Sequence, residues 1–253
     1  MKIDILTLFP QMFVGPLTES IIKRARQANI MDLSVHDLRV WAKDLHHTVD
    51  DRPYGGGVGM VIKPDIVFAA VESLAPISES CILLTCPRGQ LFDQSAARRL
   101  AGIPHLIVIC GHYEGVDERV REHLATAVFS IGDVVLTGGE LPAMIIVDAV
   151  VRLLPGVVGK EASTQEESFS GGLLDYPQYT RPANFRNWQV PDVLLSGDHE
   201  KIALWRRRKA ISRTLEQRPE LLAKAALTAE EREWLRREYA WNSSYDENLL
   251  GKL

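Results

Sequence analysis

Three glycine-rich segments of this sequence contain side chains whose types and spacing are suited to catalysis or ligand binding. They are residues 50–60 (DDRPYGGGVGM), 110–120 (CGHYEGVDERV) and 130–142 (SIGDVVLTGGELP). Glycine lets main-chain N–H groups approach a ligand, often an anion, so such segments are typical of binding loops. The first segment lacks the GK[ST] ending of a P-loop, which excludes an enzyme of that phosphate-binding type. Taken singly, each segment also fits an ordinary loop or strand-to-helix turn.

The elements that must position these segments predict an α/β fold. Short apolar runs predict buried strands over residues 3–8, 33–38, 81–85 and 106–110. Stretches between them predict helices over residues 64–74, 93–101 and 142–154. This order indicates a mainly parallel sheet, whose strand carboxyl ends are the usual ligand crevice. In such a crevice Glu114 is a better functional candidate than His112, because a carboxylate can accept N–H groups of a base edge. Val134 and Leu136 add apolar walls.

Composition sets the class of protein. The chain has 253 residues, 46% apolar and 25% charged, which excludes a disordered or fibrous protein. A net charge of −4 excludes the pervasive positive field of a protein that coats nucleic acid, so any such contact must be local. Three cysteines without a CxxC pair predict neither a disulfide scaffold nor a zinc site. With no signal peptide and no apolar stretch of about 18 residues, we expect a soluble cytoplasmic protein without membrane contact.

A second, smaller domain is predicted after residue 160. The acidic, glycine- and serine-rich stretch that follows has no Lys or Arg before Arg181, which favours a flexible linker over residues 161–175. Helices are predicted over residues 198–215 and 219–226, and a capping box opens another at Thr228. The expected organisation is therefore a domain over 1–160, the linker, and a helical domain over 176–253.

Two arginine positions stand out. Arg152 follows Asp148 by four residues in a helix that is apolar almost all round, so it either extends to water or faces a polar site. The run 205–213 holds five cationic residues and no acid. Alone, this run favours a solvated helix face over a contact with RNA phosphates.

Together these segments resemble the bacterial tRNA (guanine-N1)-methyltransferase (TrmD) family of the SPOUT class. The matching stretches run in family order over most of the chain: DDRPYGGGVGM, CGHYEGVDERV, SIGDVVLTGGELPAM, RLLPGVVGKEAS, GLLDYPQYTRP and LLSGDHEKIALWR. The resemblance implies a parallel α/β sheet with a deep trefoil knot and a small helical carboxyl-terminal domain. It also implies a homodimer in which the linker and second domain of one subunit complete the site of the other.

The implied reaction is S-adenosylmethionine-dependent methylation of N1 of guanine 37 in tRNA, next to the anticodon, where guanine occupies position 36. Carried over by position, the cofactor residues are Leu84, Pro87, Gly111, Tyr113, Ile131, Gly132, Val134, Leu136, Gly138, Gly139 and Pro142. Substrate contacts are expected from the anticodon-reading Asp50, from Glu114, and from the phosphate-binding Arg206, Arg207 and Arg208.

The implied catalytic residues are Arg152 and Glu167. A guanidinium can donate to O6 and N7 of guanine together, which suits Arg152 to stabilise charge on O6. The family has an aspartate as base before the Ser168–Phe169 pair, whereas this sequence has Glu167, which is longer by one methylene. Glu166 is an alternative base. A family magnesium requirement points to Glu114, Glu167 and Asp175 as oxygen ligands.

Two other functions stay open from the sequence. A SPOUT enzyme with a different target would modify another nucleotide or a ribose hydroxyl. A catalytically silent RNA-binding homologue would be consistent with glutamate at position 167.

Overall fold

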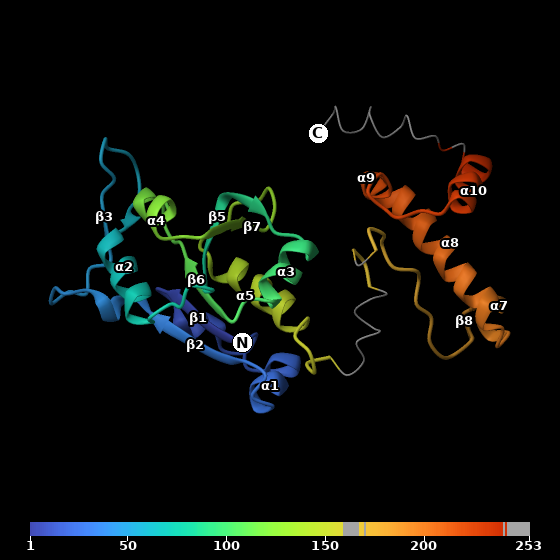
Figure 1. The fold of residues 1–253 in the computed structure, drawn as a ribbon, viewed down its shortest axis with the longest axis horizontal. Coiled ribbons are helices and arrows are strands. Elements are labelled where there is room, and N and C mark those ends of the chain that lie inside the picture. Colours follow the sequence, from blue (N-terminus) through green and yellow to red (C-terminus); the bar gives the residue numbers. More distant parts are fainter. Residues whose placement is uncertain (159–166, 170, 240, 242–253) are drawn as a thin grey trace. The chain divides into compact units, whose positions relative to one another are not determined.

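The computed structural model describes residues 1–158, 167–169, 171–239 and 241. The chain divides into two compact units, Met1–Gly159 and Lys160–Leu253, which are described separately (Figure 1). Seven residues of the predicted linker, 161–166 and 170, lie outside the described residues, and the alternative base Glu166 is one of them.

A five-stranded parallel sheet is the centre of the first unit. Its order is β2-β1-β6-β5-β7, and all four neighbouring pairs run parallel. The bounds are β1 Lys2–Thr7, β2 Asp32–Asp37, β5 Cys81–Leu91, β6 His105–Cys110 and β7 Ala127–Ser130. The α/β prediction is confirmed, and four strands begin within one residue of their predicted starts. The fifth, β7, was missed, because four residues give too little pattern to recognise.

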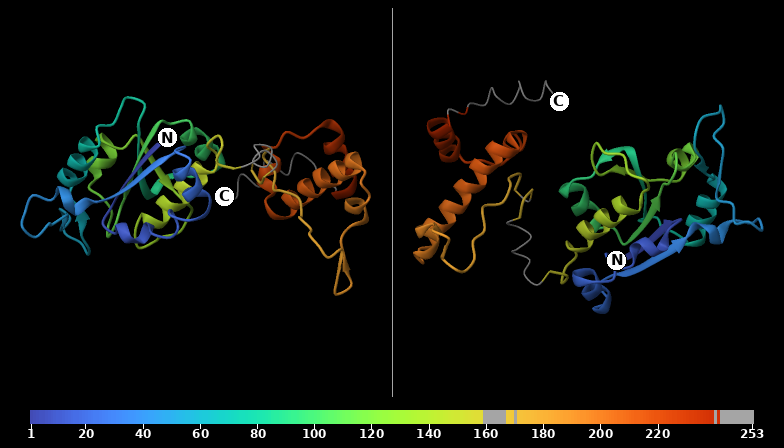
Figure 2. Two further views of the ribbon diagram at one scale, coloured as in Figure 1. Left: turned by 90° about the horizontal axis from the view of Figure 1, so that it is seen from below. Right: turned by 180° about the vertical axis from the view of Figure 1, so that it is seen from behind.

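Helices cover both faces of this sheet. The bounds are η1 Pro10–Phe13, α1 Ser20–Gln27, η2 Leu38–Trp41, α2 Pro64–Ser73, α3 Gln94–Ala101, α4 Glu118–His123 and α5 Glu140–Val151. One buried cluster joins α1, α3 and α5 to Ile3 and Ile5, and another joins α2 and α4 to Leu6. Alternate residues of β1 thus enter opposite clusters, as the pleat requires. Figure 2 shows the same unit from two further sides.

The predicted helices are confirmed with shifted ends. Asp93 caps α3 as expected, its side chain accepting from the Ala96 N–H at 2.7 Å. By contrast, α5 begins at Glu140 rather than Pro142 and ends at Val151. Its N-cap, Gly139, offers no side chain, so the usual start signal is missing from the sequence.

One carboxylate is buried among the strands. Asp4 is 1% exposed and lies 3.0 Å from Lys2 Nζ, 2.6 Å from His36 Nε2 and 2.8 Å from His105 Nε2. Burial alone raises the pKa of Asp4, but the hydrogen bonds from His36, Lys2 and His105 outweigh it, so the pKa lies below its usual value. A buried charge with several partners ties β1 to both neighbouring strands.

Strand β5 contains a bulge. Thr85 and Gln90 both pair with Phe129 of β7, so residues 86–89 loop out of the ladder. Such a bulge re-aims side chains at a strand end. Cys86, Pro87 and Arg88 are therefore held at both ends by regular pairing.

The glycine-rich segment 50–60 is the end of a short hairpin. Strands β3 (Asp50–Asp51) and β4 (Val61–Ile62) pair antiparallel, and Tyr54 and Val58 between them are almost fully exposed. Residues Gly55, Gly56, Gly57 and Gly59 have positive φ, which explains their residue type.

The second unit is mostly helical. Its elements are the hairpin β8 (Asn184–Phe185) and β9 (Trp188–Gln189), then α7 Asp192–Leu195, α8 His199–Gln217, α9 Pro219–Leu222 and α10 Ala229–Tyr239. The predicted helices 198–215 and 219–226 correspond to α8 and to a shorter α9. The capping box is confirmed: Glu231 accepts from the Thr228 N–H at 2.8 Å, and Thr228 accepts from the Glu231 N–H at 3.1 Å. Ile211 and Leu235 are fully buried in its core.

None of the described helices is long and apolar enough to cross a bilayer.

Candidate functional site

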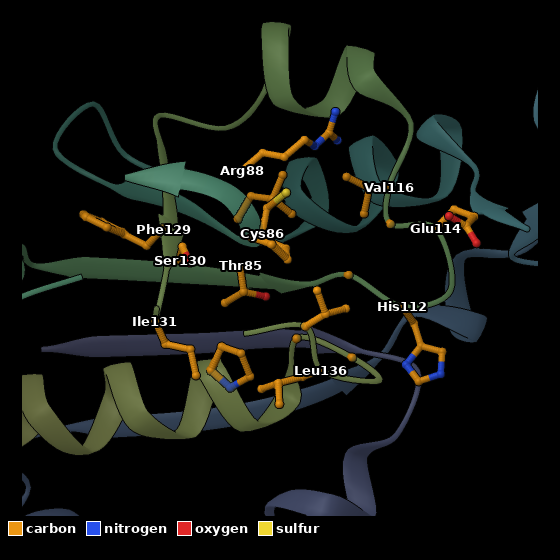
Figure 3. Close-up of a pocket in the computed structure, with 18 of the residues that line it drawn as sticks. Thr85, Cys86, Arg88, His112, Glu114, Val116, Phe129, Ser130, Ile131 and Leu136 are labelled. Atoms are coloured by element: carbon orange, nitrogen blue, oxygen red, sulfur yellow. The ribbon is translucent and has the colours of Figure 1, made fainter. Parts of the chain in front are cut away.

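The first unit has a pocket of about 260 Å³ where its central strands end (Figure 3). The pocket begins at Thr85 of β5, Gly111 after β6 and Ser130 of β7. Because parallel strands end at one edge of a sheet, three segments far apart in sequence meet there. The lining residues are Leu84–Arg88, Gly111–Val116, Glu118, Arg121, Phe129–Ile131, Val134–Gly139 and Pro142.

Every predicted cofactor residue except Gly132 lines this pocket. Gly132 lies beside it, where its N–H donates to Ser130 Oγ at 3.2 Å and its carbonyl accepts from the same hydroxyl at 2.9 Å. Gly132 therefore shapes the turn that presents Ile131 to the pocket. Its φ of +144° is a conformation that favours glycine.

Two chain segments, residues 110–112 and 138–139, cross each other in close contact. Gly139 N–H donates to the Gly111 carbonyl at 2.7 Å, and His112 forms a bridge with Gly138. A Cβ on Gly139 would lie 2.1 Å from Thr85 Oγ1 and 2.8 Å from Gly111 N. Only glycine fits this crossing. The threading of a trefoil knot stays a prediction.

A buried carboxylate lies behind the crossing. Glu140 is 1% exposed, and Thr7 Oγ1 donates to its Oε1 at 2.7 Å. His112 Nδ1 lies 3.9 Å from Oε2 and, among the described residues, is a buried nitrogen without a hydrogen-bond partner. Burial raises the pKa of the neighbouring Cys110 thiol well above its usual value, and the Glu140 charge adds to the shift. Glu140 therefore links β1 to the pocket wall.

Tyr113 joins the pocket to the glycine hairpin. Its backbone has a φ of +56°, and the centroid of its ring lies 4.7 Å from that of the His112 ring. Burial raises the pKa of Tyr113, and the charge and hydrogen bond of Asp50 raise it further. The predicted cofactor residue Tyr113 and the predicted substrate residue Asp50 are thus neighbours. Exposed Glu114 lines the same end of the pocket and packs against Gly59, whose added Cβ would lie 2.5 Å from Glu114 Oε1.

Charged side chains form the opposite rim. Arg88 Nη2 lies 3.3 Å from Glu118 Oε2, and Glu118 also pairs with Arg121. A hydrogen bond to Cys86 raises the pKa of Arg88, and Glu118 adds to that shift. These residues were missed from the sequence, since their positions depend on the β5 bulge.

Of the predicted catalytic residues, Arg152 is in the first unit and Glu167 in the second. Arg152 is half-buried and forms the C-cap of α5, its N–H donating to the Asp148 carbonyl at 3.2 Å. In the second unit Ser168 Oγ donates to Asp175 Oδ1 at 2.8 Å. The predicted metal ligands Glu114, Glu167 and Asp175 therefore come from both units. Within the described ranges no group of three His, Cys, Asp or Glu is gathered that could hold a metal ion.

The basic run lies on α8, and its arginines differ in their exposure and in their partners. Arg207 is half-buried and pairs with Glu231 at 2.7 Å, and it also donates to the Ala226 carbonyl at 3.0 Å. Exposed Arg206 lies over the Tyr176 ring and exposed Arg208 over the Trp234 ring. Arg207 thus joins α8 to α10, while its two neighbours are exposed to solvent.

Sequence reasoning missed Thr7, Thr85, Ser130 and Glu140. The only available signal was the GGE sequence at 138–140, where an acid opens an apolar helix. Thr7 lies 133 residues away from its partner, so no local pattern links them.

Comparison with known proteins agrees with the motifs. The family model described as tRNA (Guanine-1)-methyltransferase TrmD matches residues 1–224. A tRNA (guanine-N(1)-)-methyltransferase of Geobacillus kaustophilus is 56% identical over 237 residues, covering 93% of this chain and 97% of its own. Proteins of the same name from Pelotomaculum thermopropionicum and Bacillus subtilis are 56% and 55% identical, each over 93% of this chain and over 95% and 98% of their own.

Proposed function

We propose that this chain, a member of the tRNA (guanine-1)-methyltransferase TrmD family, methylates N1 of a guanine in tRNA. More specifically, we propose guanine 37 as the target, guanine 36 as its required neighbour and S-adenosylmethionine as the methyl donor. The observation that carries the proposal is the pocket at the carboxyl edge of the sheet, lined by ten residues at the family's cofactor positions.

The side chains and glycines that line the pocket suit the proposed donor. Leu84, Ile131 and Leu136 supply apolar surface for a nucleoside, and glycines at positions 111, 138 and 139 bring the main chain to the pocket wall. Its volume of about 260 Å³ is slightly below the range of roughly 300–1,000 Å³ that is usual for small-ligand sites. When bound, S-adenosylmethionine would supply an electrophilic methyl group, and breaking its S–CH3 bond would leave a neutral thioether.

The protein must provide a base and a positive charge for the guanine. N1 carries a proton, so its lone pair becomes available to the methyl carbon only when a base removes that proton. Negative charge then builds on O6, and the Arg152 guanidinium is suited to donate to it. We assign the base to Glu167, whose carboxylate carries the proton away while N1 forms the new bond.

A homodimer is part of the proposal, because the family resemblance implies that the second unit of one subunit, with Glu167, completes the site around Arg152 of the other. The exposed apolar surface of the first unit supports it: Val135 is 88% exposed, and Leu141 and Ile145 of α5 are each 48% exposed. Such a surface is typical of an interface. Sedimentation of the wild type as a dimer and of Ile145→Asp as a monomer would support the assignment, and a monomeric wild type would contradict it. Cytoplasmic location stays a prediction.

The decisive experiment measures methyl transfer. The protein is incubated with labelled S-adenosylmethionine and tRNA carrying guanine at 36 and 37, and the modified base is identified by mass spectrometry. We expect label at N1 of guanine 37, and none when adenine replaces it. Unchanged labelling of the adenine variant would favour another target, whereas tight tRNA binding without transfer would support a silent homologue.

The catalytic residues can be tested separately. Glu167→Gln should abolish turnover while cofactor affinity stays unchanged, and Glu167→Asp should retain activity because it keeps the carboxylate. Arg152→Ala should lower kcat more than it weakens cofactor binding. A loss of cofactor affinity alone would contradict the role of Arg152.

A further inference from the structure

The second unit has a pocket of its own, of about 370 Å³, formed entirely by residues 176–206. It lies between the segment before the β8–β9 hairpin, helix α7 and the first half of α8. The lining residues are Tyr176–Arg181, Ala183, Val190, Leu194, Leu195, Ile202 and Arg206. No role predicted from the sequence needs such a cavity, since phosphate contacts require only an exposed cationic face.

The charge of this pocket is of one sign. Its charged lining residues, within the described part of the chain, are Arg181 and Arg206, and no carboxylate lines it. The Arg206 guanidinium lies 4.8 Å from the centre of the Tyr176 ring, which holds a planar set of donors at the wall. An anion is the complementary ligand group.

The pocket also has aromatic and apolar walls. Tyr179 is 50% exposed. One side of its ring faces Trp205 on α8, with the two ring centroids 6.3 Å apart. Leu194 and Ile202 form an apolar side. A ring held on one side and open on the other is a stacking platform for a planar group.

The neighbouring hairpin continues the same chemistry. Its stem lines the pocket through Ala183 and Val190, which are joined by a main-chain hydrogen bond of 2.9 Å. Beyond the stem, Phe185 and Trp188 are 52% and 69% exposed, and Arg186 lies over the Phe185 ring. The hairpin projects from its unit as an arm (Figure 2, left). Alternation of exposed aromatic rings and arginines is typical of surfaces that bind single-stranded nucleic acid.

We propose that this pocket binds one unstacked nucleotide of the RNA substrate, its base against Tyr179 and its phosphate at Arg206 and Arg181. The inference rests on the proposed function for the identity of the RNA, and it adds a base-binding site remote in sequence from the methyl-transfer pocket. A hydrophobic segment of a protein partner would leave both arginines of the pocket without an anion. An unstacked base with its phosphate matches the ring, the apolar side and the charge together.

The test compares two RNAs of equal length: an anticodon stem-loop, which has unstacked bases, and a fully paired duplex. Fluorescence anisotropy with the full-length protein should show preference for the stem-loop. Tyr179→Ala should weaken stem-loop binding roughly 5- to 150-fold and leave duplex binding unchanged, whereas Tyr179→Phe should bind normally. Tyr179→Leu should fail to rescue, because an apolar side chain of similar bulk cannot stack.

Salt dependence separates the base from the phosphate. Tyr179→Ala should keep the wild-type slope of log Kd against log salt, while Arg206→Ala should reduce it by about 0.7. Arg236→Ala is the matched control, since it removes one exposed cation of α10 that pairs with Glu233 outside the pocket. Circular dichroism and thermal melting must show native folding for each variant.

Three outcomes would overturn the proposal. The first is that Tyr179→Ala binds the stem-loop with wild-type affinity. The second is that Tyr179→Ala weakens binding of the stem-loop and of the duplex equally. The third is that Tyr179→Leu binds the stem-loop with wild-type affinity. Failure of the proposed function would look different, because wild-type protein would then bind RNA through this pocket without methylating guanine N1.

Discussion

Replacing Gly139 by alanine should separate the two chain segments that cross beside the pocket of the first unit. The added Cβ would lie 2.1 Å from Thr85 Oγ1, 2.8 Å from Gly111 N and 2.9 Å from Cys110 Cα. Gly139 itself has an ordinary φ of −83°, so alanine is excluded by space rather than by backbone strain. A new rotamer of Thr85 would relieve the first contact only, because the other two involve main-chain atoms.

The size of the effect follows from these distances. Carbon atoms in contact normally lie about 3.5–4.0 Å from their neighbours, so the crossing must open by roughly 0.5–1 Å. Overpacking of this kind costs about 1–3 kcal/mol of unfolding free energy. Because the same segments line the pocket, a displacement of about 1 Å should lower methyl transfer on the order of 100-fold.

Two measurements check this prediction. Urea unfolding gives the loss of stability, and calorimetric titration with S-adenosylmethionine gives the loss of cofactor affinity. Gly102→Ala is the control, since its Cβ would meet only the Arg99 carbonyl at 3.5 Å, away from the pocket. If Gly139→Ala kept wild-type stability, affinity and turnover, the reasoning that ties this crossing to the pocket would be refuted.

Three further predictions concern buried groups. Because the folded-state pKa of Asp4 is lowered, the stability it confers is present above its unfolded pKa of about 4 and is lost as the pH falls through the folded value. Urea unfolding of Asp4→Asn should therefore show a weaker loss of stability in acid than the wild type, and parallel curves would contradict this role. Thr7→Val should lower the unfolding free energy by about 1–3 kcal/mol, because Glu140 loses its buried donor; unchanged stability would refute that bond. Iodoacetamide should label half-buried Cys86 before fully buried Cys110, and S-adenosylmethionine should slow the labelling of Cys86. Mass spectrometry of the digested protein gives the order of labelling, and earlier labelling of Cys110 would contradict the prediction.

Elements with a strong local pattern were predictable. The run His105–Cys110 is buried at all six positions, and apolar side chains dominate it, so β6 was recognisable from composition alone. Asp93 and Thr228 are side chains that cap helices, and both helix starts were found. The start of α5 was misjudged because a glycine occupies its N-cap.

The glycine motifs also located the pocket, because strand ends followed by glycine indicate close approach of the backbone to a ligand. Features that depend on partners distant in the chain could not be found this way. Arg207 belonged to a cationic run in sequence, yet its pairing with Glu231 arises from the packing of α8 on α10. The same applies to Arg88 and Glu118 at the pocket rim.

The bulge in β5 has a consequence for changes of chain length. Residues 86–89 are closed at both ends by pairing with the same residue, Phe129, and Gly89 has no room for a Cβ, which would lie 2.6 Å from the Val128 carbonyl carbon. Inserting or deleting one residue there would shift Gln90 and Leu91 by one position and turn them to opposite faces of the sheet. This wall of the pocket can therefore vary in its side chains at residues 86–88, but neither at Gly89 nor in length. The exposed glycine hairpin differs, because insertions there should be tolerated.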